Sequence, residues 1–301
     1  MGKFAMGCTI KESVMYRLFL LAITGFGLLW STLMAAQPDP VQSQARPQQR
    51  VEIQWLNQAT FKITSPAGKV IVTDPWLAPY PPALPTPLTP LEYQRPEALG
   101  KVDVLLVTHA HADHIIDAPA LARLNNIPLW GAGDLNAALT TLGVLPPAQL
   151  PRFGVGGRVT PAPGIRVTAV HAEHSSVYVW NNPETKKAET HPAGAAVGFI
   201  IELENGFRIW HMGDTGLFSD MKFIAERYRP DVVLIPIGGH FTMDPVDAAY
   251  ALREWIKPKF AIPMHYNTNP FNRGSPEELI KALGDAPVKV LTLKPGERAQ
   301  F

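Results

Sequence analysis

Cysteine is almost absent from this chain. The only one among the 301 residues is Cys8, which lies in an N-terminal segment that we expect to be removed. The remaining chain would have no thiol, so disulfide bonds and thiolate metal ligands are both excluded. A transition-metal site in this protein would therefore have to use imidazole and carboxylate ligands.

Long blocks of charge of one sign are also missing. The 27 Lys and Arg residues nearly balance the 26 Asp and Glu residues, and the formal net charge is +1. Nucleic acid is not expected as a partner, because it is bound through clustered basic residues. A small-molecule substrate is expected instead, and the composition gives no indication of the oligomeric state.

The N-terminal residues have the order of an export signal. Lys3, Lys11 and Arg17 precede an uncharged apolar run over residues 18–34, and small residues follow as far as Ala36. A basic region, an apolar region and small residues are typical of a secretory signal. We therefore expect a periplasmic or secreted protein.

This segment also defines the predicted domains. Residues 1–36 would be the signal peptide, residues 37–50 a flexible tether and residues 51–301 the folded domain. The alternative is an uncleaved membrane anchor at residues 18–34, because this run is near the minimum length that spans a bilayer. Contact with a membrane is expected only in that case.

The first part of the folded domain is predicted to be β structure. Residues 51–74 alternate apolar and polar side chains around a turn, which indicates a meander of antiparallel strands. The Pro-rich residues 75–96 that follow can be neither helix nor central strand, because proline lacks the N–H donor and fixes φ. They predict a long extended loop, either a lid over a site or a stiff connector.

Helices and strands alternate in the rest of the chain. Asp134 is the expected N-cap of one helix, and Ser275 with Glu278 forms the capping box of another. Asn205-Gly206 predicts a hairpin turn, and residues 180–194 predict a polar loop. Helices are expected over residues 117–124, 134–142, 221–228, 244–256 and 276–283, and a last strand over residues 288–293.

Several predicted strands end in a histidine or an aspartate. His109, His174, Asp214 and His265 each follow an apolar segment. Side chains at strand ends lie along one rim of a sheet, so residues far apart in sequence can converge there. The pattern predicts a site assembled from distant segments.

The segment "THAHADHI" holds three of the nine histidines. His109 and His111 are two residues apart, so their side chains point the same way on an extended segment. Asp113 and His114 come where the chain should turn into a helix. Imidazole and carboxylate together suit Zn, Fe or Mn, and a chance surface cluster would explain neither the spacing nor the preceding buried strand.

The ordered motifs around this segment resemble those of a known family. "THAHADHI", "TDP", "HSS", "GDTG", "IGG" and "PMHY" are similar to the signature of the metallo-β-lactamase superfamily and its UPF0173 branch of metal-dependent hydrolases. The resemblance covers residues 51–296. It implies an α/β fold, a four-layer αββα sandwich with mixed sheets, and two metal ions at one edge of the sheets.

The resemblance also implies a ligand set and two divalent ions. Zinc is the favoured metal, and Mn, Fe or Ni also suit nitrogen and oxygen ligands. Asp214 would bridge both ions, because a carboxylate has two oxygens. The first ion would be held by His109, His111 and His174, and the second by Asp113, His114 and His265.

The remaining candidates are expected around the ligands. Asp74 would orient a ligand imidazole through the other ring nitrogen, with a turn before Pro75 as the alternative. His211 would pack beside the ligands as a hydrogen-bonded histidine. His240 and His191 are candidates for the substrate pocket, and His240 could donate to an oxyanion or protonate a leaving group.

The predicted reaction is hydrolysis. A hydroxide bridging two metal ions would attack an ester-type bond such as a phosphodiester or a lactone, with Asp113 or a metal-bound water as the proton shuttle. The alternatives are a non-catalytic metal-binding protein and, within the same fold, a β-lactamase or a mononuclear iron oxygenase. In the family, the β-lactamases lack the bridging aspartate, so Asp214 argues against that activity.

Overall fold

The computed structural model describes residues 50–77 and 89–301. The predicted signal peptide and tether, except for the last tether residue, lie outside the described residues, as does the centre of the Pro-rich loop. Within the two described ranges, no helix combines the length and apolar character needed to cross a bilayer.

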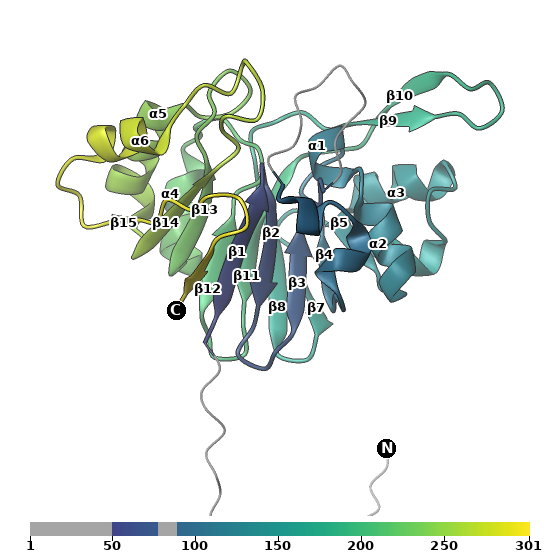
Figure 1. Ribbon diagram of the computed structural model, residues 1–301, viewed down its shortest axis with the longest axis horizontal. Coiled ribbons are helices and arrows are strands. Elements are labelled where there is room, and N and C mark those ends of the chain that lie inside the picture. Colours follow the sequence, from purple (N-terminus) through teal and green to yellow (C-terminus); the bar gives the residue numbers. More distant parts are fainter. Residues whose placement is uncertain (1–49, 78–88) are drawn as a thin grey trace, which may run out of the picture. The chain divides into compact units, whose positions relative to one another are not determined.

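The described chain is built on two seven-stranded sheets (Figure 1). The first begins as the expected antiparallel meander β1–β2–β3 and continues with parallel strands. In spatial order its strands are β16 (Arg298–Gln300), β1 (Glu52–Asn57), β2 (Thr60–Thr64), β3 (Val70–Thr73), β4 (Val104–Leu106), β5 (Leu129–Ala132) and β6 (Arg152–Phe153).

The second sheet is also mixed. The strands β12, β13, β14 and β15 run parallel to one another, whereas β7, β8 and β11 pair antiparallel. In spatial order they are β15 (Lys289–Val290), β14 (Phe260–Met264), β13 (Val232–Pro236), β12 (Arg208–His211), β11 (Val197–Glu202), β8 (Ile165–His171) and β7 (Arg158–Ala162).

Helices cover the outer face of each sheet. The first sheet carries α1 (Ala112–Ile115), α2 (Ala118–Asn125) and α3 (Gly133–Thr141), and the second carries α4 (Asp220–Tyr228), α5 (Pro245–Tyr250) with its π-helical extension η4 (Ala251–Ile256), and α6 (Pro276–Leu283). The two groups stand on opposite sides in Figure 1. The predicted four-layer αββα architecture is confirmed.

Strand β4 shows how the layers are held together. Its residues are all buried, and successive side chains point to opposite faces. Val104 and Leu106 pack into the core between the sheets, whereas Leu105 packs under α2 and α3. A continuous apolar run is thus the sequence of a strand that is covered on both faces.

Some local predictions differ from the structure. Helix α3 begins at Gly133 with Ala132 as its N-cap, so Asp134 lies inside the first turn and does not cap it. The Pro-rich loop is not wholly extended, because short 3-10 turns form at Leu91–Tyr93 (η1) and Pro96–Leu99 (η2). A third such turn, η3, lies at Pro147–Gln149. Proline precedes or begins each turn, where its fixed φ is compatible with a helical turn.

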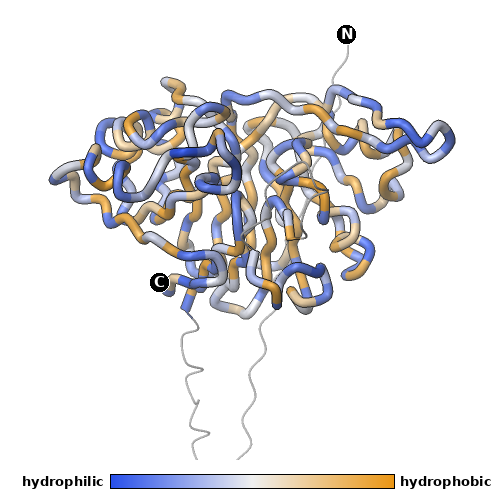
Figure 2. The backbone as a smooth tube through the Cα atoms, turned by 45° about the horizontal axis from the view of Figure 1, so that its top comes forward, coloured by the Kyte–Doolittle hydropathy of each residue, from blue (hydrophilic) through white to orange (hydrophobic). Residues whose placement is uncertain are grey.

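Several β elements were also missed, among them β6 and β7. The predicted polar loop overlaps a hairpin of β9 (Val177–Asn181) and β10 (Ala188–Pro192), which projects from the domain and has a hydrophilic tip (Figures 1 and 2). The last predicted strand is only Lys289–Val290, and the chain then returns to the first sheet as β16.

Candidate metal centre

Four strand ends bring the predicted ligands together. His109 follows β4, His174 follows β8, Asp214 follows β12 and His265 follows β14. His111, Asp113 and His114 lie at or within the short helix α1. All seven side chains belong to three overlapping groups whose ligand atoms lie within 4.8 Å of one another.

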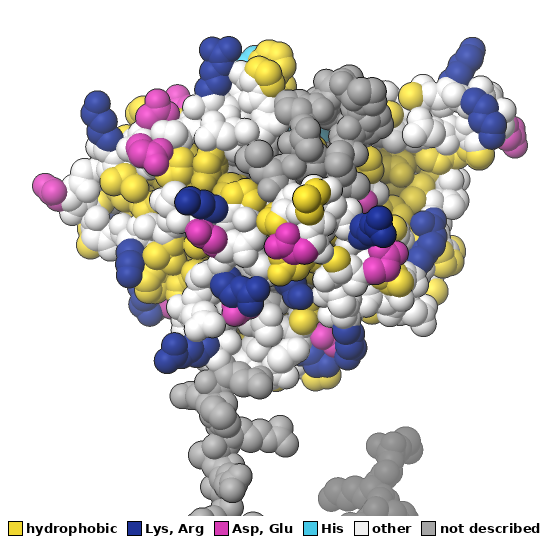
Figure 3. Space-filling model, in the orientation of Figure 1, with side chains coloured by type: hydrophobic (Ala, Val, Ile, Leu, Met, Phe, Trp, Pro, Cys, Tyr) yellow, Lys and Arg dark blue, Asp and Glu magenta, His cyan; other side chains and the backbone are white. Residues whose placement is uncertain are grey.

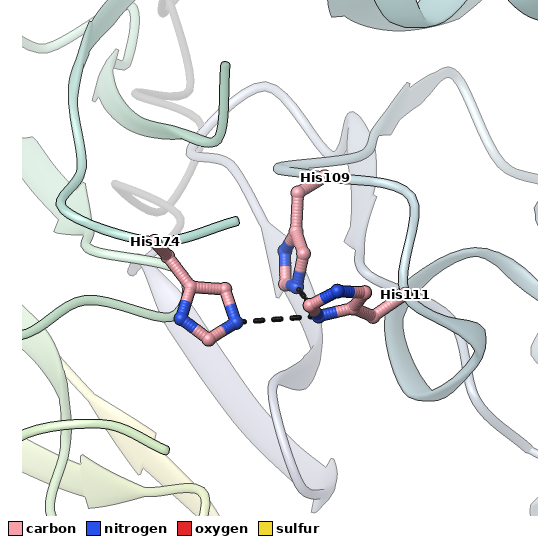
Figure 4. A group of neighbouring side chains, drawn as sticks. All are labelled: His109, His111 and His174. Atoms are coloured by element: carbon pink, nitrogen blue, oxygen red, sulfur yellow. Dashed lines mark hydrogen bonds between the residues drawn. The ribbon is translucent and has the colours of Figure 1, made fainter. Parts of the chain in front are cut away.

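The first group consists of three imidazoles that point toward one another (Figure 4). His111 Nδ1 lies 3.0 Å from His109 Nε2 and 3.2 Å from His174 Nε2. Tetrahedral zinc with Zn–N bonds of about 2.0–2.1 Å separates its nitrogens by roughly 3.3 Å. The three nitrogens therefore have the spacing of one face of a metal coordination shell.

The second group combines a carboxylate with two imidazoles. Asp113 Oδ2 lies 3.6 Å from His114 Nε2 and 3.4 Å from His265 Nε2. His114 and His265 are buried, and their rings stack with centroids 5.6 Å apart. These atoms also converge at the spacing of metal ligands.

Asp214 lies between the two groups. Its Oδ1 is 3.3 Å from His114 Nε2, and its Oδ2 is 3.0 Å from His265 Nε2. The same Oδ2 lies 3.6 Å from His174 Nε2 of the first group. A bridging carboxylate requires contact with both groups, and Asp214 has it.

Two buried polar atoms in this cluster, His114 Nε2 and Asp214 Oδ1, make no well-formed hydrogen bond among the described residues, although they lie 3.3 Å from each other. A buried polar group without a partner is costly, since it loses its hydration and gains nothing in return. A divalent cation beside both atoms would satisfy them, so the donor set fits a metal centre.

Asp74 and Thr108 set which nitrogen of two histidines faces the cluster. Asp74 Oδ2 lies 2.8 Å from His114 Nδ1 and accepts the Thr108 hydroxyl at 2.6 Å. Because that hydroxyl donates to Asp74, it accepts from Nδ1–H of His109 at 3.1 Å. In this tautomer Nε2 of both histidines carries the lone pair that a metal ligand needs.

Charges inside the cluster shift its protonation. Burial alone would lower the pKa of His265, but the carboxylates of Asp214 and Asp113 outweigh it and raise this pKa to about 9. Burial alone would raise the pKa of Asp214, but His265 and His114 outweigh it and hold this pKa well below its usual range. The carboxylates therefore favour positive charge at this place, which protons or metal ions can supply.

Left-handed backbone conformations also gather here. Asp74 (φ 41°), Gln58 (φ 48°) and His265 (φ 58°) are all non-glycine residues with positive φ. Such conformations are uncommon and cluster at functional sites, where the surrounding structure enforces them. Gly238 shows the crowding, because a Cβ there would lie 2.2 Å from the His265 carbonyl oxygen.

A cavity of about 420 Å³ opens at the cluster. Its lining includes five of the candidate ligands together with apolar and amide side chains. The lining residues are Gln58, Trp76, His111, Asp113, His174, Ser175, Asp214, Phe241, His265, Thr268 and Asn269.

Two predicted pocket residues lie elsewhere. His240 is exposed and stacks on Phe271, with ring centroids 5.0 Å apart, and it is not among the residues that line this cavity. Its positive φ of 58° turns the chain so that the neighbouring Phe241 lines the cavity. His191 lies on β10 against Trp180, also outside the lining.

The two other histidines also lie outside the ligand groups. His211 is buried, with Nε2 2.9 Å from the Ala59 carbonyl oxygen and Nδ1 accepting from the Gly213 N–H at 3.1 Å. Both of its ring nitrogens are therefore used within the protein. His171 is exposed and lies 3.2 Å from Glu173.

Sequence reasoning missed several residues of the site. Thr108 directly precedes the histidine cluster, so its hydroxyl could have been considered from position alone. Gln58, Trp76 and Phe241 carry no comparable signal, because their partners are distant in sequence. Only the fold brings them to the cavity.

Replacing Asp74 by asparagine should weaken metal binding. The amide cannot accept from Thr108 and His114 as the carboxylate does, and loss of such an outer partner typically costs about 10–100-fold in metal affinity. Titration of metal-free protein with Zn²⁺ against a competing chelator measures this. Asp285→Asn is the control, because Asp285 is exposed, and it should leave the metal affinity unchanged. Equal affinities in the wild type, Asp74→Asn and Asp285→Asn would refute the role of Asp74.

Comparison with known proteins places this chain in a family. The profile of the beta-lactamase superfamily domain matches residues 52–265. A UPF0173 metal-dependent hydrolase of Polaromonas sp. is 64% identical over 252 residues, covering 84% of this chain and 90% of that protein. A UPF0173 metal-dependent hydrolase of Polynucleobacter asymbioticus is 54% identical over 280 residues, covering 91% and 96%.

A solved structure shares the fold. Igni18, described as a novel metallo hydrolase of Ignicoccus hospitalis, is 32% identical, with a TM-score of 0.69, and the match covers 84% of this chain and 98% of that one. The family profile, the close relatives and the clustered histidines and aspartates agree with one another. This chain belongs to the UPF0173 metal-dependent hydrolases of the metallo-β-lactamase superfamily.

Proposed function

We propose that this protein hydrolyses an ester-type bond, such as a phosphodiester or a lactone, at a centre of two divalent ions. Two ions in such a centre share a water, lower its pKa toward neutral and hold the resulting hydroxide for attack. The observation that carries the proposal is the convergence of seven imidazole and carboxylate side chains, two of whose buried atoms make no well-formed hydrogen bond within the described part of the chain.

The residues divide into two holding groups and a bridge. His109, His111 and His174 would hold the first ion. Asp113, His114 and His265 would hold the second, and Asp214 would contact both. The two carboxylates would offset part of the charge of two dications. Zinc is the favoured metal, and Mn, Fe and Ni suit the same donor atoms.

The cavity supports a small substrate. Trp76 and Phe241 offer apolar surface, whereas Thr268, Asn269 and Ser175 offer hydrogen-bonding groups. A mixture of apolar surface and a few polar groups is typical of small-molecule sites. The volume of about 420 Å³ suits a compact ester better than a polymer.

Asp113 is placed to move a proton. Its side chain is 28% exposed, so it reaches the cavity as well as the second ligand group. A carboxylate at this boundary can take a proton from the attacking water and pass it to a leaving group or to solvent. We assign the proton shuttle to Asp113 on this basis.

Metal removal tests the proposal. Purified protein should hydrolyse chromogenic phosphodiesters or lactones, and dialysis against a chelator should lower the rate by more than about 100-fold, since even outer partners of a metal are worth 10–100-fold. Two equivalents of Zn²⁺ or Mn²⁺ should restore it. Hydrolysis that survives complete metal removal would contradict the mechanism, and turnover of no substrate with two ions bound would favour a non-catalytic metal-binding protein.

Export is a separate part of the proposal. The basic and apolar order of residues 1–36 supports delivery to the periplasm or the medium, with an anchor at residues 18–34 as the alternative. The charged side chains on the described face in Figure 3 are of both signs and interspersed, which gives no basic surface for nucleic acid on that face.

A further inference from the structure

Gln58 occupies an unusual position in the turn between β1 and β2. It is buried, with 1% of its surface exposed, and its φ is 48°. Glycine or asparagine would adopt this conformation at lower cost, and a long amide side chain is rarely buried without a partner. The contacts of its side chain explain why it is there.

The amide of Gln58 contacts the second ligand group. Its Nε2 lies 2.7 Å from Asp113 Oδ2 and 2.7 Å from His265 Nε2. Its Oε1 accepts from the Thr268 hydroxyl at 2.5 Å. Asp113 Oδ2 and His265 Nε2 are two of the three atoms that would bind the second ion. The Gln58 amide donates to Asp113 Oδ2 and lies against His265 Nε2, so it stands directly beside the position that the ion would take.

The backbone holds Gln58 in this place. Its carbonyl oxygen accepts from the His265 N–H at 3.1 Å and from Trp55 Nε1 at 3.0 Å. The ring of Trp55 stacks on Tyr266, the neighbour of His265, with centroids 5.2 Å apart. Main chain and side chain thus join the β1–β2 turn to the end of β14, and Gln58 cannot move far from the ligands.

Gln58 can accommodate an ion in the second position by a single rotation of its side-chain amide. Rotation of the terminal amide about its last side-chain bond exchanges oxygen and nitrogen. The carbonyl oxygen then faces Asp113 and His265, and the NH₂ group donates to the Thr268 hydroxyl oxygen. No backbone shift is required, and an amide oxygen is an acceptable ligand for hard divalent cations.

We propose that Gln58 is an additional, switchable ligand of the second metal ion. In protein stripped of metal it donates to Asp113 and lies against His265, and in metal-loaded protein it turns its carbonyl oxygen to the ion. This assignment rests on the two-ion centre proposed above.

A difference between the two metal positions follows. The first group offers three imidazole nitrogens, whereas the second offers two imidazoles, the Asp113 carboxylate and the Gln58 amide oxygen. More oxygen ligands favour Mn²⁺-like ions relative to a nitrogen-rich site. Gln58 therefore contributes to the metal preference of the second position.

The test compares three variants of the full-length protein. Gln58→Leu keeps the approximate shape of the side chain and removes the oxygen, and Gln58→Glu keeps an oxygen at the same place. Gln54→Leu is the matched control, because Gln54 is buried on β1, which leads into the turn of Gln58, but donates to Gly296 and Tyr93 away from the site. Circular dichroism verifies that each protein is folded.

The readouts are bound metal and ligand geometry. Metal-free proteins are titrated with Mn²⁺ and Zn²⁺ against a competing chelator, bound ions are counted by elemental analysis, and the Co²⁺ absorption spectrum reports coordination number. We expect Gln58→Leu to lower the affinity for the second ion by about 10–100-fold, comparable to loss of an ordered partner of a metal ligand. The affinity for the first ion should be unchanged. Gln58→Glu should bind the second ion at least as tightly as the wild type.

The outcomes separate this assignment from the proposed function. Wild-type protein that binds a single ion overturns both the proposed two-ion function and the role of Gln58. Wild-type protein that binds two ions, together with a Gln58→Leu variant whose second ion is equally or more tightly bound, overturns only the role of Gln58. A Gln58→Glu variant that loses the second ion as Gln58→Leu does also overturns it, because the oxygen would then not be the relevant atom.

Discussion

Replacement of Asp214 by asparagine is expected to lower hydrolysis by at least about 100-fold and the metal content from two ions to at most one. Asp214 contacts His114, His265 and His174, so its carboxylate joins both ligand groups. Asparagine offers a single neutral oxygen, which cannot bridge two cations. The estimate is conservative, because even residues outside the ligand shell contribute about 10–100-fold.

Elemental analysis and the rate with a chromogenic phosphodiester or lactone measure this effect. Asp220→Asn is a matched control six residues away, since Asp220 is exposed at the start of α4. It should keep both the ions and the rate. An Asp214→Asn protein that keeps two ions and wild-type turnover would refute the bridge.

The largest effect on folding is expected from Phe199→Ala. Phe199 on β11 is fully buried between the sheets and stacks against Phe153 on β6, with ring centroids 6.3 Å apart. Removing such a ring costs its transfer free energy and leaves a cavity that the sheets cannot close. The free energy of unfolding should fall by about 3–5 kcal/mol.

Denaturant unfolding of metal-free protein isolates this effect from metal binding, which would otherwise stabilise the folded state. Phe223→Ala makes the same chemical change on α4, where the ring is 65% exposed. The free energy of unfolding of Phe223→Ala should differ from that of the wild type by no more than about 0.5 kcal/mol, as for most surface substitutions. Similar losses in the two variants would mean that Phe199 does not hold the sheets together.

Periodicity made much of the fold predictable. The buried runs that became β4 and β13, the meander of β1 to β3 and the capping box of α6 are all local patterns. Ser275 accepts from the Glu278 N–H at 3.2 Å, and the Glu278 carboxylate accepts from the Ser275 N–H at 3.2 Å. Such contacts depend on residues three positions apart, so sequence alone contains them.

Local patterns failed where burial or pairing is decided elsewhere. The β9–β10 hairpin lacks apolar–polar alternation, because four consecutive residues of β9 are apolar whereas β10 is mostly polar. Strand β16 is three residues long and is recognisable only through its pairing with β1 at the other end of the chain. Neither carries the apolar periodicity that identifies a strand.

The sequence by itself determined the chemistry of the site. With no cysteine outside the predicted signal segment, and with histidines and aspartates at successive strand ends, only nitrogen and oxygen ligands remained. These residue types are read directly, because a ligand's chemistry belongs to its side chain. The segment "THAHADHI" by itself places four of the seven candidate ligands within six residues.

The tertiary structure decided which other side chains meet those ligands. Gln58 and His265 are 207 positions apart, yet their side chains are 2.7 Å apart. The backbone conformation at His240 brings Phe241 to the cavity instead of the histidine. Strand pairing and a few left-handed turns set these contacts, and both depend on the packing of the whole sandwich, which no local pattern in the chain contains.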